Sequence, residues 1–276
     1  MDRQQLSKAE HKITLRQRVN EAQALYLSAN QQRGLGAGAA YVTTATIQRP
    51  GLLQTLNIDV TEDKGDITDV TVSGLSLFCS DSSAAAACFN SKSFGAPKRS
   101  IGISIDNNQT VVVQGSNVTG GTSSVAVAIY PLKSSDVKPP GEQASKFNYM
   151  FGLGTVSVPA GAAATASLVA IATRPTTLGE IILANHSAGG TAVLSEDVVV
   201  EDIIVSGLSM FAGATGAQQI SLSTFENSAS DIMGLCLNYP ILTNARVEVV
   251  LRNYDAANAC QVSGGILCEA YNMVGK

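Results

Sequence analysis

Histidine beside serine and acid is the grouping in this chain that could support acid–base or nucleophilic chemistry. There are two histidines, His11 and His186. A Ser-His-Asp arrangement could in principle be drawn from the many serines. However, neither histidine is accompanied by a G-x-S-x-G turn or another nucleophile motif. His11 falls among charged residues, and His186 lies in residues 185–190, which we interpret as a loop. We therefore predict that the chain is not an enzyme.

A cluster of carboxylates is the second grouping with possible chemistry. Five acidic residues follow one another closely and could supply oxygen ligands for calcium, although their spacing is not that of an EF-hand loop: Asp59, Glu62, Asp63, Asp66 and Asp69. The simpler interpretation is a charged hairpin between two strands. If a metal does bind, Asp63 and Asp66, which we place at the turn, are the first candidates. We predict no required cofactor.

The cysteines are five in number and include no C-x-x-C pair, which argues against a zinc site. Cys79 and Cys88 allow two interpretations, a disulfide across a loop or buried free thiols. The glycines of residues 34–39 have the wrong spacing for a phosphate-binding loop and lack a following Lys-Ser or Lys-Thr.

Residues 2–32 contain no Gly or Pro and predict an amphipathic helix, which the glycines of residues 34–38 would end and follow with a hinge. Residues 1–33 hold six basic and three acidic groups, so this segment carries +3 of a total charge of −4 and the remainder carries −7. One interpretation is contact with an anionic membrane or the inner face of an assembly. The other is docking of the apolar stripe on the protein's own β structure. Specific nucleic-acid binding is disfavoured because acids are interspersed. The basic residues concerned are Arg3, Lys8, Lys12, Arg16 and Arg18.

After this segment the sequence predicts an all-β protein. Short runs of Val, Ile and Thr are interrupted by Gly, Pro, Asn and Asp, and no amphipathic helix lies between them. No run approaches 18 uninterrupted apolar residues, so we expect no membrane-spanning helix. Only 14% of residues are charged, which suits a chain that covers surface against neighbours.

An internal repeat predicts two tandem β-sandwiches. Residues 69–78 (DVTVSGLSLF) recur as residues 202–211 (DIIVSGLSMF), 133 positions later, with seven of ten residues identical. Residues 101–106 align with 233–238 at an offset of 132, and Arg-Pro at 49–50 recurs at 174–175. A period near 130 is that of a domain. We expect a helix at 1–34, a first sandwich at 35–138 and a second at 139–276, joined by a Pro-containing linker at 133–141.

Within the repeat, the apolar alternation slips by one residue at Ser73-Gly74 and again at Ser206-Gly207. An extra residue at a glycine is typical of a β-bulge that bends a strand. The alternative is that Ser-Gly ends one strand before the next begins.

This organisation resembles the double jelly-roll major capsid proteins of tailless, membrane-containing icosahedral bacteriophages, the corticovirus-like and finnlakevirus-like groups. The resemblance rests on the repeated V-S-G-L-S-[LM]-F and G-[IL]-x-[IL]-[DN] blocks and covers the whole chain. It implies two jelly rolls, a homotrimer that forms a pseudo-hexagonal capsomer, and an icosahedral shell over a lipid membrane. It also implies a penton or spike protein as partner, and a virion protein made in the host cytoplasm.

Two other classes of function fit the composition less well. A tandem adhesin or spike that binds a surface carbohydrate would use exposed aromatic rings, yet the chain has no Trp and only seven Tyr and seven Phe. An enzyme on a jelly-roll scaffold, such as a cupin, would need several histidine metal ligands, which two histidines do not supply.

Overall fold

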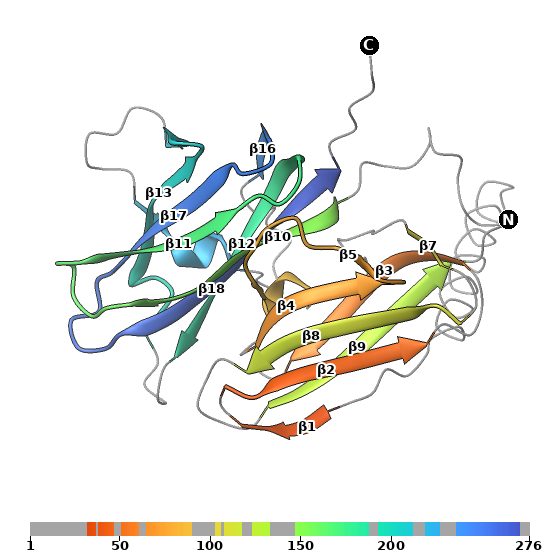
Figure 1. Cartoon of the computed structure of the whole chain (residues 1–276). Coiled ribbons are helices and arrows are strands. Elements are labelled where there is room, and N and C mark those ends of the chain that lie inside the picture. Colours follow the sequence, from red (N-terminus) through yellow and green to blue (C-terminus); the bar gives the residue numbers. More distant parts are fainter. Residues whose placement is uncertain are drawn as a thin grey trace, which may run out of the picture.

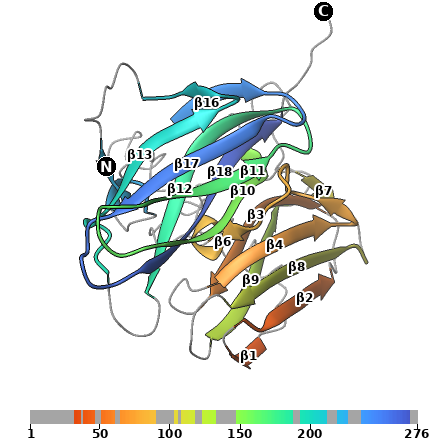
Figure 2. The same ribbon diagram turned by 60° about the vertical axis from the view of Figure 1, so that its left-hand side comes forward.

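The computed structural model describes residues 32–36, 38–46, 51–60, 65–89, 103–105, 108–117, 123–132, 147–187, 193–211, 219–226 and 236–270. These residues form an all-β structure whose strands pair antiparallel within sheets. We call residues 32–132 the first half and residues 147–270 the second half. Figures 1 and 2 show the two halves side by side.

The first half contains two sheets, with strand orders β1-β9-β3-β7 and β2-β8-β4-β5, and β6 pairs with β4 beside the second of them. Its elements are β1 (Gln32–Leu35), β2 (Ala40–Thr46), β3 (Gly51–Val60), β4 (Gly65–Val72), β5 (Leu75–Ser76), β6 (Ala84–Ala85), the 3-10 turn η2 (Ala86–Cys88), β7 (Ile103–Ile105), β8 (Thr110–Asn117) and β9 (Ser123–Leu132).

The second half repeats this arrangement, with orders β10-β18-β12-β16 and β11-β17-β13-β14, and with β15 paired to β13. Its elements are β10 (Phe147–Val158), β11 (Thr165–Ile171), β12 (Thr176–Ser187), β13 (Val198–Val205), β14 (Leu208–Ser209), β15 (Ile220–Ser221), the 3-10 turn η5 (Leu222–Thr224), β16 (Cys236–Ile241), β17 (Arg246–Asn253) and β18 (Cys260–Ala270). Each strand thus has a counterpart at the same place in the first half.

The second half is a sandwich because the inner faces of its two sheets form one apolar core. Phe151 and Leu153 of β10 and Ile181 of β12 pack in the same cluster as Val249 of β17 and Ile203 of β13, and all five are buried. Every second residue of β17 is buried, as expected for a strand with one face in the core.

The best-matched repeat block folds into the same hairpin twice. β4 pairs with β5 through Val72 and Leu75, and β13 pairs with β14 through Val205 and Leu208. Between them, Ser73-Gly74 have φ of 53° and 81°, and Ser206-Gly207 have 52° and 84°. Two successive positive φ angles indicate a type I′ turn. The predicted β-bulge at Ser-Gly is therefore wrong, and the alternative, a strand end, holds. The bulges lie earlier, between Ile67 and Asp69 and between Val200 and Asp202.

Pairing partners also correct the second repeat match. β7 pairs with β3 through Ile105 and Gly51, and β16 pairs with β12 through Ile241 and Thr176. Ile105 therefore corresponds to Ile241, an offset of 136, and the predicted alignment at 132 is wrong by four residues. Asn108 and Asn244, also 136 apart, both have φ of 66°. The Arg-Pro pairs at 49–50 and 174–175 do hold corresponding positions, because β3 and β12 each begin at the residue after such a pair.

The predicted N-terminal helix is wrong at its last residue, because Gln32–Leu35 form β1 and pair with β9. The boundary placed after residue 34 therefore cuts a strand of the first half, and the expected hinge at 34–38 begins inside it. The rest of the predicted helix, and the predicted linker at 133–141, lie outside the described residues.

Candidate functional site: the junction between the two halves

The two halves are joined by a segment of the first half, Leu77–Ala85, which we call the junction segment. After the β4–β5 hairpin it runs along the free edge of β10. The amide of Cys79 donates to the carbonyl of Met150 at 2.9 Å, and the amide of Met150 donates to the carbonyl of Leu77 at 2.8 Å. Further along, the amide of Gly154 donates to the carbonyl of Ser83 at 2.7 Å. These backbone bonds cover an edge that a strand at the border of a sheet would otherwise leave unpaired.

The junction segment also binds the other sheet of the second half, at the end of β11. The amide of Thr173 donates to the carbonyl of Cys79 at 2.9 Å, and the amide of Asp81 donates to that of Ile171 at 3.1 Å. The carboxylate of Asp81 accepts from the amide of Ile171 at 2.8 Å. One short segment therefore spans both sheets of the second half, which opposes hinge motion between the halves.

Glycines on the second half permit this close approach. A Cβ on Gly152 would lie 2.1 Å from the carbonyl oxygen of Ser82, and one on Gly265 would lie 2.8 Å from Sγ of Cys88. Both distances are too short for any side chain. The backbone at these two positions is therefore part of the contact surface.

The apolar part of the junction buries the outer face of the sheet β10-β18-β12. Met150, Ile182 and Leu267 belong to the same buried cluster as Ala84–Ala86, Cys88 and Ile67 of the first half. Their neighbours Phe151, Leu183 and Ile266 point the other way, into the core of the second half. A sheet covered on both faces is the setting in which strands carry continuous apolar runs.

A row of polar side chains lies beside this apolar contact. Asp66 of β4 is 5% exposed. Its Oδ2 accepts a hydrogen bond from Thr155 Oγ1 of β10 and one of 3.4 Å from Ser83 Oγ of the junction segment. Ser263 of β18 lies directly across from Thr155 in the sheet, and its hydroxyl also bonds to Asp66. Oδ1 of Asp66 is buried without a close partner among the described residues.

His186 completes this row from β12. Its Nε2 lies 2.5 Å from Ser263 Oγ, and both residues are buried. The serine hydroxyl thus stands between histidine and aspartate, whereas in a hydrolase triad the histidine stands between the other two. A buried hydroxyl in this order has no access to a substrate. We interpret these five residues as a structural polar cluster.

Burial governs the electrostatics of the cluster. It raises the pKa of Asp66 above its ordinary value, against the opposing effect of the hydroxyl donors Thr155, Ser263 and Ser83. Burial also raises the pKa of Tyr41, whose hydroxyl approaches the backbone carbonyl of Asp66 at 3.5 Å. The site therefore favours the protonated form of the Asp66 carboxyl more than water does.

The structure describes only some of the predicted site residues. Arg3, Lys8, Lys12, Arg16 and Arg18 lie outside the described residues, as do His11 and Asp63. Asp66 is a buried residue of β4, so its predicted placement at a turn is wrong. Across the ranges that the structure describes, no group of three or more His, Cys, Asp and Glu side chains is placed to hold a metal ion.

Other sequence interpretations are settled by burial. Cys79 and Cys88 are buried free thiols, as are Cys260 and Cys268. His186 lies in β12 and not in a loop. Ser83, Thr155 and Ser263 were missed as members of the cluster. Thr155 and Ser263 lie inside β10 and β18, and Ser83 precedes β6, so no common position in the sequence marked them.

No helix within the described ranges has both the length and the apolar character to cross a lipid bilayer. A scan against protein-family models gave no match, and a search of curated proteins gave none either.

Proposed function

We propose that this protein is a virion coat subunit, a major capsid protein made of two tandem jelly rolls. In this proposal three copies form a pseudo-hexagonal capsomer, capsomers tile an icosahedral shell over a lipid membrane, and the chain has no catalytic activity.

The strand order is the observation that carries the proposal. Leaving aside the short β6 and β15, the described residues of each half form eight strands. Numbered along the chain, they lie in the orders 1-8-3-6 and 2-7-4-5. This order supports our proposal that each half is a jelly roll, a double-sheet sandwich that occurs in viral capsid proteins. Two such units in one chain give a subunit that can occupy two neighbouring positions of a lattice.

The junction supports the same proposal. A lattice subunit must present its two halves at one fixed angle, and the backbone bonds of the junction segment to β10 and β11 hold them so. A tandem adhesin has no such requirement, since its domains act separately and flexible connections are common between them.

The test is the solution mass of the purified protein by light scattering after size exclusion, followed by electron microscopy. We expect a species near three times 28.5 kDa, or closed particles. A monomer at micromolar concentration that does not assemble on addition of salt, calcium or lipid would overturn the proposal and favour the carbohydrate-binding alternative.

A further inference from the structure

The polar cluster at the junction holds the carboxyl of Asp66 unevenly. Hydroxyl groups from both halves donate to its Oδ2, that of Ser83 at 3.4 Å and that of Thr155 on β10. Oδ1 of the same carboxyl is buried and has no hydrogen-bond partner among the described residues. An ionised Asp66 would therefore place negative charge on an oxygen with no described donor and little access to solvent, which is costly. The contact between the halves is closed around a carboxyl that tolerates ionisation poorly.

The ionisable groups near Asp66 come from three neighbouring elements. Tyr41 of β2 brings its hydroxyl to 3.5 Å from the Asp66 carbonyl oxygen. His186 of β12 lies one serine hydroxyl away, and η2 brings the thiol of Cys88 to the same contact. Within the described ranges no Lys or Arg forms an ion pair with Asp66. The other neighbours carry uncharged side chains: Ala85, Ser116, Thr155 and Ser263.

The junction can open without loss of the second half, because the two sets of apolar residues are separate. Met150 and Leu267 face the first half, in the cluster that also holds its alanines. Phe151 and Ile266, their neighbours in sequence, belong to the sandwich core of the second half. Separation of the halves exposes the first set and leaves the second packed. Such local opening requires less free energy than global unfolding.

We propose that the junction is a pH-sensitive latch: ionisation of Asp66 releases the first half from the sheet β10-β18-β12 while the second half stays folded. Below the ordinary aspartate pKa, the carboxyl is protonated in the closed and the open form alike, and the latch is tightest. The latch loosens as the pH rises from that value through the raised pKa of the closed form, because water in the open form stabilises the charge better. Such a latch operates whether or not the protein forms a shell.

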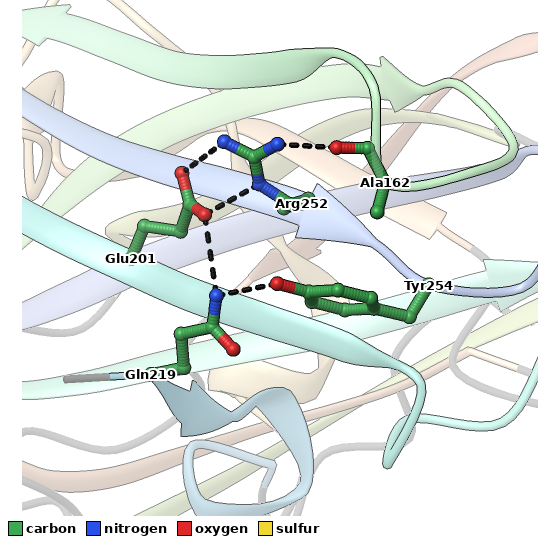
Figure 3. Close-up of polar contacts among 5 residues, drawn as sticks. All are labelled: Ala162, Glu201, Gln219, Arg252 and Tyr254. Carbon is green, nitrogen blue, oxygen red and sulfur yellow. Dashed lines mark hydrogen bonds and ion pairs between the residues drawn. The ribbon is translucent and has the colours of Figure 1, made fainter. Parts of the chain in front are cut away.

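The second half supplies a control, a carboxylate whose charge is paired (Figure 3). Counted back from the bulges of β4 and β13, Val199 stands where Asp66 does. Two residues further along β13, Glu201 accepts from Arg252 through Nε at 2.5 Å and through a terminal nitrogen at 3.1 Å, and from Gln219 at 3.5 Å. The Glu201 side chain is also 22% exposed. Its ionisation therefore leaves no buried, unpaired charge.

The test follows Cys88, which is wholly buried in the closed junction. Alkylation of the full chain by iodoacetamide is measured at a series of pH values, residue by residue, by mass spectrometry of peptides. Cys260, in the core of the second half, is the internal reference. Each variant is compared with the unmodified chain at the same pH, so that the ordinary rise of thiolate with pH cancels. Circular dichroism establishes that each variant folds.

Four variants separate the groups involved. Asp66→Asn removes the ionisation, and Thr155→Val removes a donor that favours the ionised form. His186→Gln removes the other ionisable side chain of the polar row. Glu201→Gln, the matched control, removes the paired carboxylate of the second half.

We expect labelling of Cys88 in the unmodified chain to accelerate relative to Asp66→Asn as the pH is raised, by about tenfold for each unit by which the closed-form pKa exceeds its ordinary value. Thr155→Val should enlarge this acceleration, and His186→Gln and Glu201→Gln should retain it. Cys260 should react at one rate in all five proteins.

Equal labelling of Cys88 in the unmodified chain, Asp66→Asn and Thr155→Val at every pH would overturn the latch. Acceleration at Cys88 and Cys260 together would overturn it too, since the whole protein would then be unfolding. Loss of the acceleration in His186→Gln would assign the titration to His186 and remove Asp66 from this role.

Discussion

Gly152 and Ser82 lie so close that nothing larger than hydrogen fits between them: a Cβ on Gly152 would stand 2.1 Å from the Ser82 carbonyl oxygen and 2.3 Å from that of Ser83. The atoms that would have to move are backbone atoms of the junction segment. Relief of the clash in a Gly152 variant would therefore separate the junction segment from β10.

Gly152→Ala should lower the free energy of unfolding by about 3 kcal/mol, the upper range for overpacking. Urea unfolding followed by circular dichroism measures this change. Gly36→Ala is the control, since a Cβ there meets no atom within 4 Å, and it should change stability by less than about 0.5 kcal/mol. Equal effects of the two substitutions would mean that the junction segment does not pack as described.

Asp66 predicts a pH dependence of stability. Burial raises the pKa of its carboxyl in the folded state, so the folded protein binds this proton more tightly than the unfolded chain does. The contribution of Asp66 to the free energy of unfolding is therefore greatest in acid. This contribution falls as the pH rises from the ordinary aspartate pKa through the raised pKa of the folded state.

Asp66→Asn removes this titration and keeps the shape of the side chain. Relative to the variant, the unmodified protein should lose stability as the pH is raised through that window. Unfolding free energies measured in urea at a series of pH values provide the comparison. Parallel curves for the two proteins would contradict the burial of an ionisable group at the junction.

Gly74→Ala and Gly207→Ala should cost nearly equal amounts, because the two hairpins are copies. A Cβ meets no atom within 4 Å at either position, so the cost is backbone strain at φ of 81° and 84°, roughly 1–2 kcal/mol each. The effects should add in the double variant, since the hairpins are separate. Chemical denaturation of all three variants measures this, and a marked inequality would show that one hairpin has an additional role.

The buried thiols should resist modification. Burial raises the pKa of Cys260 to about 11, and Cys79, Cys88 and Cys268 are buried as well, so these four side chains provide little thiolate at neutral pH. With Ellman's reagent and no reductant, we expect at most one fast-reacting thiol in the native protein and all five in denaturant. Three thiols in denaturant would instead reveal a disulfide.

The basic N-terminal residues give a prediction that follows from the sequence alone. Replacing Arg3, Lys8, Lys12, Arg16 and Arg18 by Gln should weaken binding of the protein to anionic vesicles by about 1 kcal/mol for each side chain at the surface. Flotation with anionic vesicles measures it, and neutral vesicles are the control. Equal flotation of both proteins would favour docking of this segment on the protein itself.

The repeat was the most informative part of the sequence. Its significance is seen at Asp69 and Asp202, which hold the two copies of the hairpin closed. Asp69 accepts a 2.7 Å hydrogen bond from Ser76, and Asp202 accepts one of 2.7 Å from Ser209. Such retained pairs predicted two copies of one fold. The turn itself was missed because Ser73 and Ser206 adopt positive φ, which serine does rarely and which no propensity rule anticipates.

The junction could not be predicted in the same way. Residues 82–87 (SSAAAA) have the composition of a small-residue loop or one helical turn, which does not indicate that they are buried. Ala84 and Ala86 are buried in one cluster with Met150 and Leu267 of the second half, and contacts between residues so far apart leave no local periodicity. Asp66 was misplaced for a related reason: an acidic residue near a glycine is usually a turn residue, and only a distant set of hydroxyls makes its burial tolerable.

The position of β18 has a consequence for how the chain folds on the ribosome. This strand, the last one described, lies inside its sheet between β10 and β12. Until Cys260–Ala270 has been synthesised, that sheet lacks an interior strand and the alanines of the first half lack part of their cover. The first half must therefore wait, with an apolar surface exposed, until residues 260–270 have emerged. Aggregation during synthesis, more than loss of stability afterwards, is then the hazard that chaperones would have to contain.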